Sequence, residues 1–494
     1  MNYCSTRGKE INVTSAEAIK NGLAPDGGLY VPTQFPAVSV DEMKKMLSMN
    51  YIDRAVFILS RFLTDFTADE LQECAKNAYT GKFDSATPAP TVKLTDNEYV
   101  CELWHGPTCA FKDMALQILP HLLKASIKKT GEDKTVVILV ATSGDTGKAA
   151  LEGFKDVNGT KIIVFYPNDG VSDIQKLQMV TQEGGNVAVF AINGNFDNAQ
   201  TGVKDIFSDP AFGKEMSDRG YVFSSANSIN FGRLVPQVVY YFSSYLDLAA
   251  SGAINIGDKV NFAVPTGNFG NILAAYYAMR MGLPVNRLIC ASNRNSVLTD
   301  FINTGVYDRN RDFYCTISPS MDILISSNLE RLLFELSGRD DKLVLNLMGA
   351  LKKDGRYTVP NEVKNAMSSL FWGGFIDDEA TKAVINENFR NSNYIPDTHT
   401  SVALGVYEKY LKETGDKTKT IVMSTASPFK FAKDVLDALG TKTDFADYRL
   451  LSALEDEYKI KMPAPLKDLN KKEVRFKEVF EKDEMRKAVS SALK

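Results

Sequence analysis

The sequence predicts an α/β protein built on parallel sheets, and three observations lead to this fold class. From about residue 135, apolar runs of strand length alternate with amphipathic runs of helix length, as in parallel sheets with helical crossovers. Two glycine-rich turns each follow a buried strand and precede a helix. The first 90 or so residues show helical spacing instead. A chain of 494 residues exceeds the size of one core, so two or three structural units are expected.

The N-terminal segment, residues 1–90, is expected to form a mainly helical domain. Apolar residues recur at intervals of three and four in DEMKKMLSMN, RAVFILSRFL and ADELQECAKNAY. The two prolines of TPAPTVKL indicate a boundary near residue 90, because proline interrupts helices and central strands. Two strands should follow, at 91–94 and 99–104, and DMALQILPHLLKASIKK (113–129) should form a helix.

Residues 135–228 are expected to form a small parallel-sheet subdomain. The alternating elements are strands at 136–141, 161–166, 187–192 and 221–227, and helices at 146–155, 172–184 and 195–209. Residues 91–134 and 229–440 should form a larger subdomain. Its expected elements are helices at 231–250 and 271–282, strands at 260–265, 288–293 and 419–426, and mostly helix over 320–420. From residue 441 the charge rises, which predicts a solvated helical tail over 441–494.

Composition excludes several classes of function. A net charge of −4 and a pI near 5.7 give no broad basic surface for nucleic acid or anionic lipid. The six cysteines form no CxxC pair and the three histidines have no metal-ligand spacing, so neither a disulfide framework nor a metal site is expected. The start of the chain has no apolar signal segment, and the apolar runs are too short to cross a membrane. A cytoplasmic protein without nucleic-acid, membrane or obligate protein partners is therefore expected.

Two strand–turn–helix units could hold anions. VVILVATSGDTGKAALEGF places SGDTG between a buried strand and a helix, and VNFAVPTGNFGNILAAYYA does the same with TGNFGN. Unpaired amides and the positive dipole end at a helix start attract negative groups. Either turn alone could be an ordinary connection, but two of this composition favour binding. A nucleotide P-loop is excluded, since it would need glycine at Thr142 and a hydroxyl at Ala149.

Lys112 stands out among the lysines of the chain. It lies in WHGPTCAFKDMA, between apolar residues and the expected helix start at 113. An ordinary lysine would be a solvated surface charge. Apolar neighbours and a helix start both disfavour the ammonium, so the pKa of Lys112 should fall toward that of a usable free amine. Beside two anion-binding turns, such an amine suggests a Schiff base with pyridoxal phosphate.

At this point the sequence resembles the threonine synthase family, in the branch found in many bacteria and fungi. STRG and GLAPDGGLYVP resemble its N-terminal domain, and HGPTCAFKDMA resembles its pyridoxal-lysine motif. ATSGDTGKAA, SANSINFGRLVPQ, PTGNFGNILAAYYA, ISPSMDI with SNLER, and STASPFKF resemble its later blocks in order. The resemblance covers nearly the whole chain. It implies a tryptophan-synthase-β-like fold with two parallel-sheet subdomains, the larger for pyridoxal phosphate and the smaller for a substrate loop.

The resemblance also implies roles for particular residues. Lys112 would carry the cofactor and then act as the mobile acid and base, while Thr425 would face the pyridine nitrogen. The remaining assignments are a phosphate cradle of Gly267, Asn268, Phe269, Gly270 and Asn271, a substrate loop of Thr142, Ser143, Gly144, Asp145 and Thr146, and a substrate-phosphate pocket of Arg233 and Lys430 with Ser228 and Asn230 assisting. Each residue of that last group could instead be structural.

The implied reaction converts O-phosphohomoserine and water to threonine and phosphate, the last step of threonine biosynthesis. Lys112 would remove the Cα proton. A Cβ proton and then the phosphate at Cγ would leave, Cγ would be reprotonated, and water would add at Cβ. The main alternative is a phospho-lyase that releases 2-oxobutyrate from the same substrate. Serine or threonine dehydratases lack the GLAPDGGLYVP block, and a non-catalytic scaffold would not need Lys112 with both glycine turns.

The family block commonly reads STAHPAKF, whereas this chain has Ser427 and Phe429. An imidazole contact near the ring or the substrate phosphate is therefore absent from this position. His105, close to Lys112 in the sequence, could contact the cofactor or Asp113, or serve only the local structure.

Overall fold

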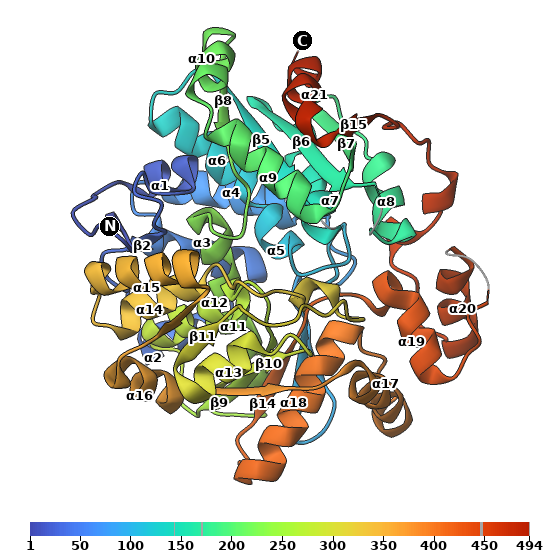
Figure 1. Ribbon diagram of the computed structural model, residues 1–494. Coiled ribbons are helices and arrows are strands. Elements are labelled where there is room, and N and C mark those ends of the chain that lie inside the picture. Colours follow the sequence, from blue (N-terminus) through green and yellow to red (C-terminus); the bar gives the residue numbers. More distant parts are fainter. Residues whose placement is uncertain (143, 169–170, 445–447, 494) are drawn as a thin grey trace.

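The computed structural model describes residues 1–142, 144–168, 171–444 and 448–493 (Figure 1). Its N-terminal segment is mainly helical, as predicted, with α1 (Ser15–Asn21), α2 (Val40–Met46), α3 (Tyr51–Phe62) and α4 (Ala68–Tyr79). Thr14, Ser39 and Thr67 begin α1, α2 and α4 with capping boxes, in which a glutamate three residues later accepts the amide of the cap. An antiparallel pair of strands, β1 (Tyr3–Ser5) and β2 (Tyr30–Pro32), adds to these helices.

The larger sheet has six strands in the order β13-β10-β9-β14-β4-β3. Their bounds are β13 Phe371–Phe375, β10 Val285–Ser292, β9 Val260–Pro265, β14 Thr420–Ser424, β4 Glu98–Glu102 and β3 Thr91–Lys93. All neighbours pair in parallel except β3 and β4. The strand β13 lies in a range that the sequence predicts as mostly helical. Its pairing with β10 is a tertiary interaction that short local patterns do not reveal.

The helices of this part of the chain include the two that follow Lys112. The predicted helix 113–129 is split into α5 (Asp113–Leu116) and α6 (Leu119–Lys129), with Pro120 in the first turn of α6, where its missing N–H costs nothing. The other elements are α11 Phe231–Ala250, α12 Gly270–Arg280, α13 Val297–Thr304, α14 Leu329–Leu336, α15 Asp341–Asp354, α16 Asn361–Leu370, α17 Asp378–Ser392, α18 Thr398–Thr414 and α19 Ala432–Leu439, the strands β11 Val306–Asp308 and β12 Arg356–Thr358, and the short 3₁₀ turns η1 Pro319–Met321 and η2 Pro428–Phe431.

The smaller sheet lies in the upper part of Figure 1 and is wholly parallel, in the order β15-β7-β6-β5-β8. Its strands are β15 Val479–Glu481, β7 Val187–Asn193, β6 Thr160–Pro167, β5 Thr135–Ala141 and β8 Tyr221–Ser224, and the helices between them are α7 Asp145–Phe154, α8 Asp173–Val180, α9 Phe196–Phe207 and α10 Pro210–Asp218. This sheet and the six-stranded one confirm the predicted pair of parallel sheets.

The expected solvated helical tail over 441–494 is wrong in part. After α20 (Tyr448–Tyr458) and the turns η3 (Ala464–Leu466) and η4 (Leu469–Lys471), the chain returns to the smaller sheet and adds β15 beside β7. The turn η5 (Lys482–Glu484) and α21 (Met485–Ala492) follow, and Met485, Ala488 and Val489 of α21 are buried in the core of that sheet. These three residues form an apolar stripe at helical spacing within a highly charged segment, and a count of charges does not detect such a stripe.

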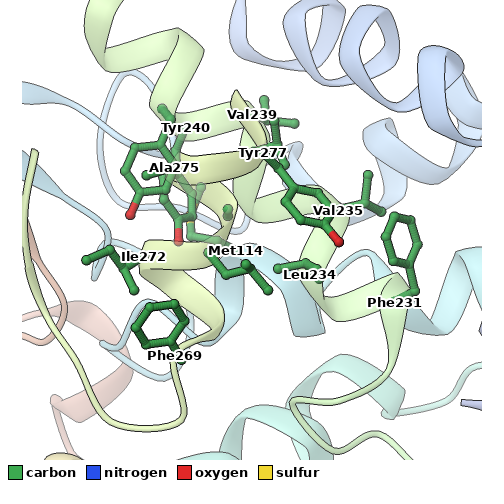
Figure 2. Close-up of a cluster of buried hydrophobic side chains, with 14 of the residues drawn as sticks. Met114, Phe231, Leu234, Val235, Val239, Tyr240, Phe269, Ile272, Ala275 and Tyr277 are labelled. Atoms are coloured by element: carbon green, nitrogen blue, oxygen red, sulfur yellow. The ribbon is translucent and has the colours of Figure 1, made fainter. Parts of the chain in front are cut away.

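A cluster of buried side chains sets the positions of α5, α11 and α12. Figure 2 shows Met114 of α5 among Leu234 of α11 and Ile272 of α12, all of them in the main core. Burying each such side chain stabilises the fold by roughly 1.5–3 kcal/mol. Because these helices begin beside Lys112, Arg233 and the turn 266–271, the same core holds three parts of the candidate site. Among the helices of the described residues, none combines the length and hydropathy that a membrane crossing requires.

Candidate active site

Three adjacent parallel strands bring the candidate residues to one edge of the larger sheet. In the sheet, β14 lies between β4 and β9. The chain leads from the carboxyl end of β4 to Lys112, from β14 directly to Thr425, and from β9 to the turn at Gly267. The amide of Phe111 donates to the carbonyl oxygen of Thr425 at 2.8 Å. Ligands of open α/β sheets bind at this edge.

Lys112 is nearly enclosed, with a side chain that is 12% exposed. Its Nζ lies 3.3 Å from Ser320 Oγ and 3.6 Å from Asp145 Oδ2. Burial lowers the pKa of Lys112, in the direction predicted from its apolar neighbours; Asp145 opposes the shift, whereas Lys430 and Arg233 add to it. Since α5 has only four residues, these two cations replace a long helix dipole as the source of positive potential.

The loop before Lys112 is held by Asp113. The amide and the hydroxyl of Thr108 both donate to the Asp113 carboxylate at 2.8 Å. A Cβ at Gly106 would lie 2.6 Å from Asp113 Oδ2, so only glycine fits there. Burial raises the pKa of Asp113 to about 7 despite these hydrogen bonds. The structure therefore places Asp113 behind the loop as its anchor.

The turn 142–146 supplies a carboxylate to the site. Asp145 Oδ1 lies 2.8 Å from Lys430 Nζ and accepts a hydrogen bond from Gln175 Nε2 at 2.8 Å. Burial opposes the charged form, but Lys430 and Lys112 hold the pKa of Asp145 well below its usual range. Between two cations, this side chain would repel a substrate carboxylate, so any contribution of Asp145 to carboxylate binding must come from its backbone amide.

The other members of this turn have different positions. Thr142 Oγ1 accepts the amides of Gly144 and Gly147 at 3.0 and 2.9 Å, so its hydroxyl stabilises the turn. Gly144 has a φ of 147°, and a Cβ there would lie 2.5 Å from Gln175. Thr146 lies in the first turn of α7 and is half-buried. Ser143 lies outside the described residues.

The turn after β9 has the form of a phosphate site. Phe269 adopts a left-handed conformation with a φ of 63° immediately before α12 begins at Gly270. Within the described part of the chain, the backbone amides from Gly267 to Asn271 have no protein acceptor. Asn271 also has a buried Nδ2 without a protein partner in that part of the chain. Such amides at a helix start fit a phosphate group, and with Lys112 they fit pyridoxal phosphate.

Gly267→Ala should weaken pyridoxal-phosphate binding by about 10-fold or more. A Cβ at position 267 would lie 2.5 Å from the backbone oxygen of Ser320, so the turn or the Ser320 segment must shift. Equilibrium dialysis of the cofactor with the variant measures the effect. Gly349→Ala, in open space on α15, is the matched control, and equal affinities for both variants would contradict the prediction.

The four candidates for the substrate phosphate differ in what they already contact. Lys430 is buried and binds Asp145, the carbonyl of Thr108 and Gln178 Oε1. Asn230 caps α11, donating to the carbonyl of Ile19 and accepting the amide of Gly232. Arg233 donates from Nη1 to the carbonyl of Ala226 at 2.9 Å, but its buried Nε has no partner in the described part of the chain.

Burial lowers the pKa of Arg233 to about 10, which still leaves the guanidinium charged at neutral pH. Ser228 is half-buried in the turn before α11. Within the described part of the chain, Arg233 thus has a buried donor to offer, whereas Lys430 and Asn230 are engaged in structural contacts.

Thr425 and Ser427 follow β14 beside the lysine loop. Thr425 is buried, and its amide donates to Thr400 Oγ1 at 3.3 Å. Ser427 begins η2, and its amide donates to the carbonyl of Cys109 at 3.0 Å. Ser427, where the resemblance implies a histidine, is fully buried.

Sequence reasoning missed the roles of Ser320, His399 and Gln175. Ser320 contacts Lys112 from 208 residues away, and His399 Nε2 accepts the Ser320 amide at 3.0 Å. The ISPSMDI block was a signal for Ser320, but no local pattern links it to Lys112. Gln175 carries no signal of its own, because its contact with Asp145 depends on how α8 packs against α7.

His105 contacts two acidic side chains. Among the described residues it forms no hydrogen bond with Lys112. Its Nδ1 lies 2.7 Å from Asp84 and its Nε2 lies 2.9 Å from Glu102. Burial opposes the charge, but these hydrogen bonds outweigh it and raise the pKa of His105 to about 9. These contacts favour a structural role for His105 over a contact with the cofactor or Asp113.

Protonated His105 should make the stability of the fold pH-dependent. Its folded pKa of about 9 exceeds the ordinary value of 6.5, so the stabilisation is complete below about pH 6.5 and is lost as pH rises through 9. The thermal midpoint of the wild type should fall more steeply over this range than that of His105→Gln. His121→Gln is the control, since burial lowers the pKa of His121 to about 4. Parallel curves for the wild type and His105→Gln would refute the assignment.

Three family descriptions match the chain. Residues 2–79 match "Threonine synthase N terminus", residues 85–346 match "Pyridoxal-phosphate dependent enzyme", and residues 400–489 match "Threonine synthase, C-terminal". The chain is therefore a member of the pyridoxal-phosphate-dependent enzymes. More narrowly, the chain belongs to the threonine synthase family, which confirms the resemblance seen in the sequence.

Individual relatives agree with this assignment. Human "Threonine synthase-like 1" is 42% identical over 438 residues; the match covers 86% of this chain, which spans only 58% of that relative's length. Threonine synthase from Pseudomonas aeruginosa is 39% identical, with 88% of this chain and 90% of the relative covered. The crystal structure of pyridoxal-phosphate-bound threonine synthase from Brucella melitensis superposes with a TM-score of 0.89 at 36% identity and covers all of both chains. These matches confirm the predicted fold class.

Proposed function

We propose that this protein converts O-phosphohomoserine and water to threonine and phosphate with pyridoxal phosphate bound at Lys112. The observation that carries the proposal is the enclosed, low-pKa amine of Lys112 beside the amide turn that begins at Gly267. Pyridoxal phosphate, when bound, stabilises negative charge at the substrate carbon next to the amino group. Membership of the threonine synthase family, which the comparisons establish, makes O-phosphohomoserine the substrate of choice.

Cofactor binding, proton transfer and substrate binding are assigned to different residues of the chain. Lys112 would bind the cofactor covalently and would move protons at Cα, Cβ and Cγ, a role that the lowered pKa of its amine favours. The amides at Asp145 and Thr146, at the start of α7, bind the substrate carboxylate. Thr425, which directly follows β14, would present its hydroxyl to the ring nitrogen.

The substrate phosphate needs a cation that is not already neutralised. Arg233 meets this condition, because its guanidinium is buried and retains an unpaired Nε–H within the described part of the chain. A bound phosphate would restore the missing hydrogen bond, and charge-assisted bonds of this kind are the strong ones. Lys430 acts indirectly, by holding Asp145 in place.

The proposed compartment is the cytoplasm. All six cysteines are free thiols, and five of them are buried, which suits a reducing environment. Small molecules are the proposed partners, namely the cofactor, the phosphorylated substrate and water.

Product analysis tests the proposed function. The purified protein, saturated with pyridoxal phosphate, is incubated with O-phosphohomoserine, and threonine, phosphate and 2-oxobutyrate are quantified. We expect threonine and phosphate in equal amounts. Phosphate with 2-oxobutyrate and no threonine would replace the proposal with the phospho-lyase alternative, and the absence of all three products would refute both.

A further inference from the structure

The short turn η1 (Pro319–Met321) joins three parts of the site through one residue, Ser320. Its hydroxyl accepts a hydrogen bond from Lys112 Nζ at 3.3 Å. Its carbonyl oxygen lies so close to Gly267 that an added Cβ there would approach it to 2.5 Å. Its amide donates to His399 Nε2 at 3.0 Å. Ser320 thus lies between the reactive amine and the phosphate turn.

His399 is fixed in one orientation. Its ring Nδ1 lies 2.8 Å from Asp397 Oδ2, and the same oxygen accepts the His399 amide at 2.9 Å. The ring packs against Phe431, with 4.7 Å between ring centroids, and the residue is 3% exposed. Because Nε2 receives the Ser320 N–H, it must present a lone pair, which leaves the ring proton on Nδ1.

Asp397 itself is locked as the N-cap of α18. It is fully buried, and its Oδ1 accepts the amide of Thr400 at 3.0 Å. Asp397, His399 and Ser320 therefore form a chain of hydrogen bonds that runs from a rigid helix start to the partner of Lys112.

We propose that Ser320 is a further catalytic residue, whose hydroxyl orients the amine of Lys112, and that His399 is the positioning residue that holds Ser320 in place. This inference rests on the proposed function, in which Lys112 carries the proton transfers.

The chemistry favours a hydroxyl in this position. Serine can accept a hydrogen bond from an ammonium and donate one to a neutral amine, so it remains a partner while Lys112 gains and loses protons. Asp145 is less suited than Ser320 to orient the amine. Its Oδ2 is 3.6 Å from Nζ, beyond hydrogen-bond distance, and its other oxygen is engaged by Lys430 and Gln175.

The charged and the neutral neighbours of Lys112 have different functions. Asp145 on α7, Lys430 on η2 and Arg233 on α11 set the electrostatic potential at the amine. The uncharged hydroxyl of Ser320 orients the amine through a hydrogen bond. A displaced turn would leave the electrostatics unchanged and still misdirect the proton, which is costly because proton transfer requires close alignment.

A double-mutant cycle tests the functional half of the inference. Ser320→Ala should lower kcat by about 10-fold, the effect of losing one neutral hydrogen bond, with KM changed by less than about 3-fold. His399→Phe should have a similar effect, and His399→Gln, which keeps an acceptor, should recover much of the loss. The double variant Ser320→Ala/His399→Phe should be no slower than Ser320→Ala, because His399 acts through Ser320.

Additive losses in the double variant would overturn the positioning role of His399, and a fully active Ser320→Ala would overturn the role of Ser320. Ser369→Ala, which removes an exposed hydroxyl on α16, is the matched control. It should be indistinguishable from the wild type.

A measurement on the cofactor-free protein tests the geometry independently. His399→Phe should accelerate hydrogen exchange at the Ser320 amide by about 10-fold, whereas His399→Gln should stay near the wild-type rate. Unchanged exchange in His399→Phe would overturn the hydrogen-bond chain. The rate at which Lys112 captures added pyridoxal phosphate should also fall in Ser320→Ala and not in Ser369→Ala. If the wild type forms no threonine, the proposed function fails, but these two readouts still decide the present inference.

Discussion

Replacing Lys112 with alanine should abolish turnover and remove the visible absorbance of lysine-bound pyridoxal phosphate. The amine is the group placed both to bind the cofactor covalently and to move protons, and a positioned acid or base contributes roughly 10²–10⁴-fold to a rate. We expect kcat to fall by about 10³-fold or more. Absorbance spectra and product formation from O-phosphohomoserine measure the two effects.

Borohydride reduction provides the direct check on the assignment. In the wild type it should bleach the absorbance and leave a pyridoxyl group on the peptide that contains Lys112, detectable by mass spectrometry. Lys128→Ala, which alters an exposed lysine on α6, is the control and should behave as the wild type. A Lys112→Ala variant that still binds the cofactor covalently would show that another lysine serves this role.

The second large effect is expected from Asp145→Asn. The substitution removes the negative charge between Lys430, whose side chain is fully buried, and Lys112. Removing one partner of a buried ion pair costs about 3–5 kcal/mol, because the other charge stays buried without compensation. We expect a fall of roughly 5 °C in the thermal midpoint, together with a loss of activity, because Asp145 also holds up the pKa of Lys112.

A second substitution tests whether the unpaired charge of Lys430 causes the loss of stability in Asp145→Asn. Asp145→Asn combined with Lys430→Met removes both members of the pair, so much of the lost stability should return. Glu183→Gln, which removes an exposed carboxylate from its pair with Lys155, is the control for losing one acid and should change the midpoint little. If the double variant is as unstable as Asp145→Asn alone, the buried Lys430 charge is not the cause.

Much of the architecture could be predicted from local patterns. The strands that became β5 and β6 contain continuous apolar runs, and such runs are typical of parallel strands buried on both faces. The turns that follow β5 and β9 contain glycine where the backbone or its neighbours exclude a side chain, as at Gly144 and Gly267. Lys112 was recognisable because its apolar neighbours already imply burial.

The errors share one cause. The pairing of β15 with β7 joins segments almost 290 residues apart, and the pairing of β13 with β10 joins segments about 80 residues apart. Neither short strand has a pattern strong enough to stand out locally. Charge along 441–494 suggested solvent exposure, but burial depends on one face of α21, which its position against the smaller sheet selects.

The sequence by itself determined most of the element types, the parallel sheets, the glycine turns and the lysine, because each follows from the chemistry of neighbouring residues. Only the tertiary structure decided which groups surround that lysine. Asp145 on α7, Ser320 on η1 and Arg233 on α11 come from three distant segments, and only the packing of the folded chain brings them to Lys112. Hydrogen bonds and charge interactions act over a few ångströms in space, irrespective of distance along the chain, so local sequence patterns do not contain them.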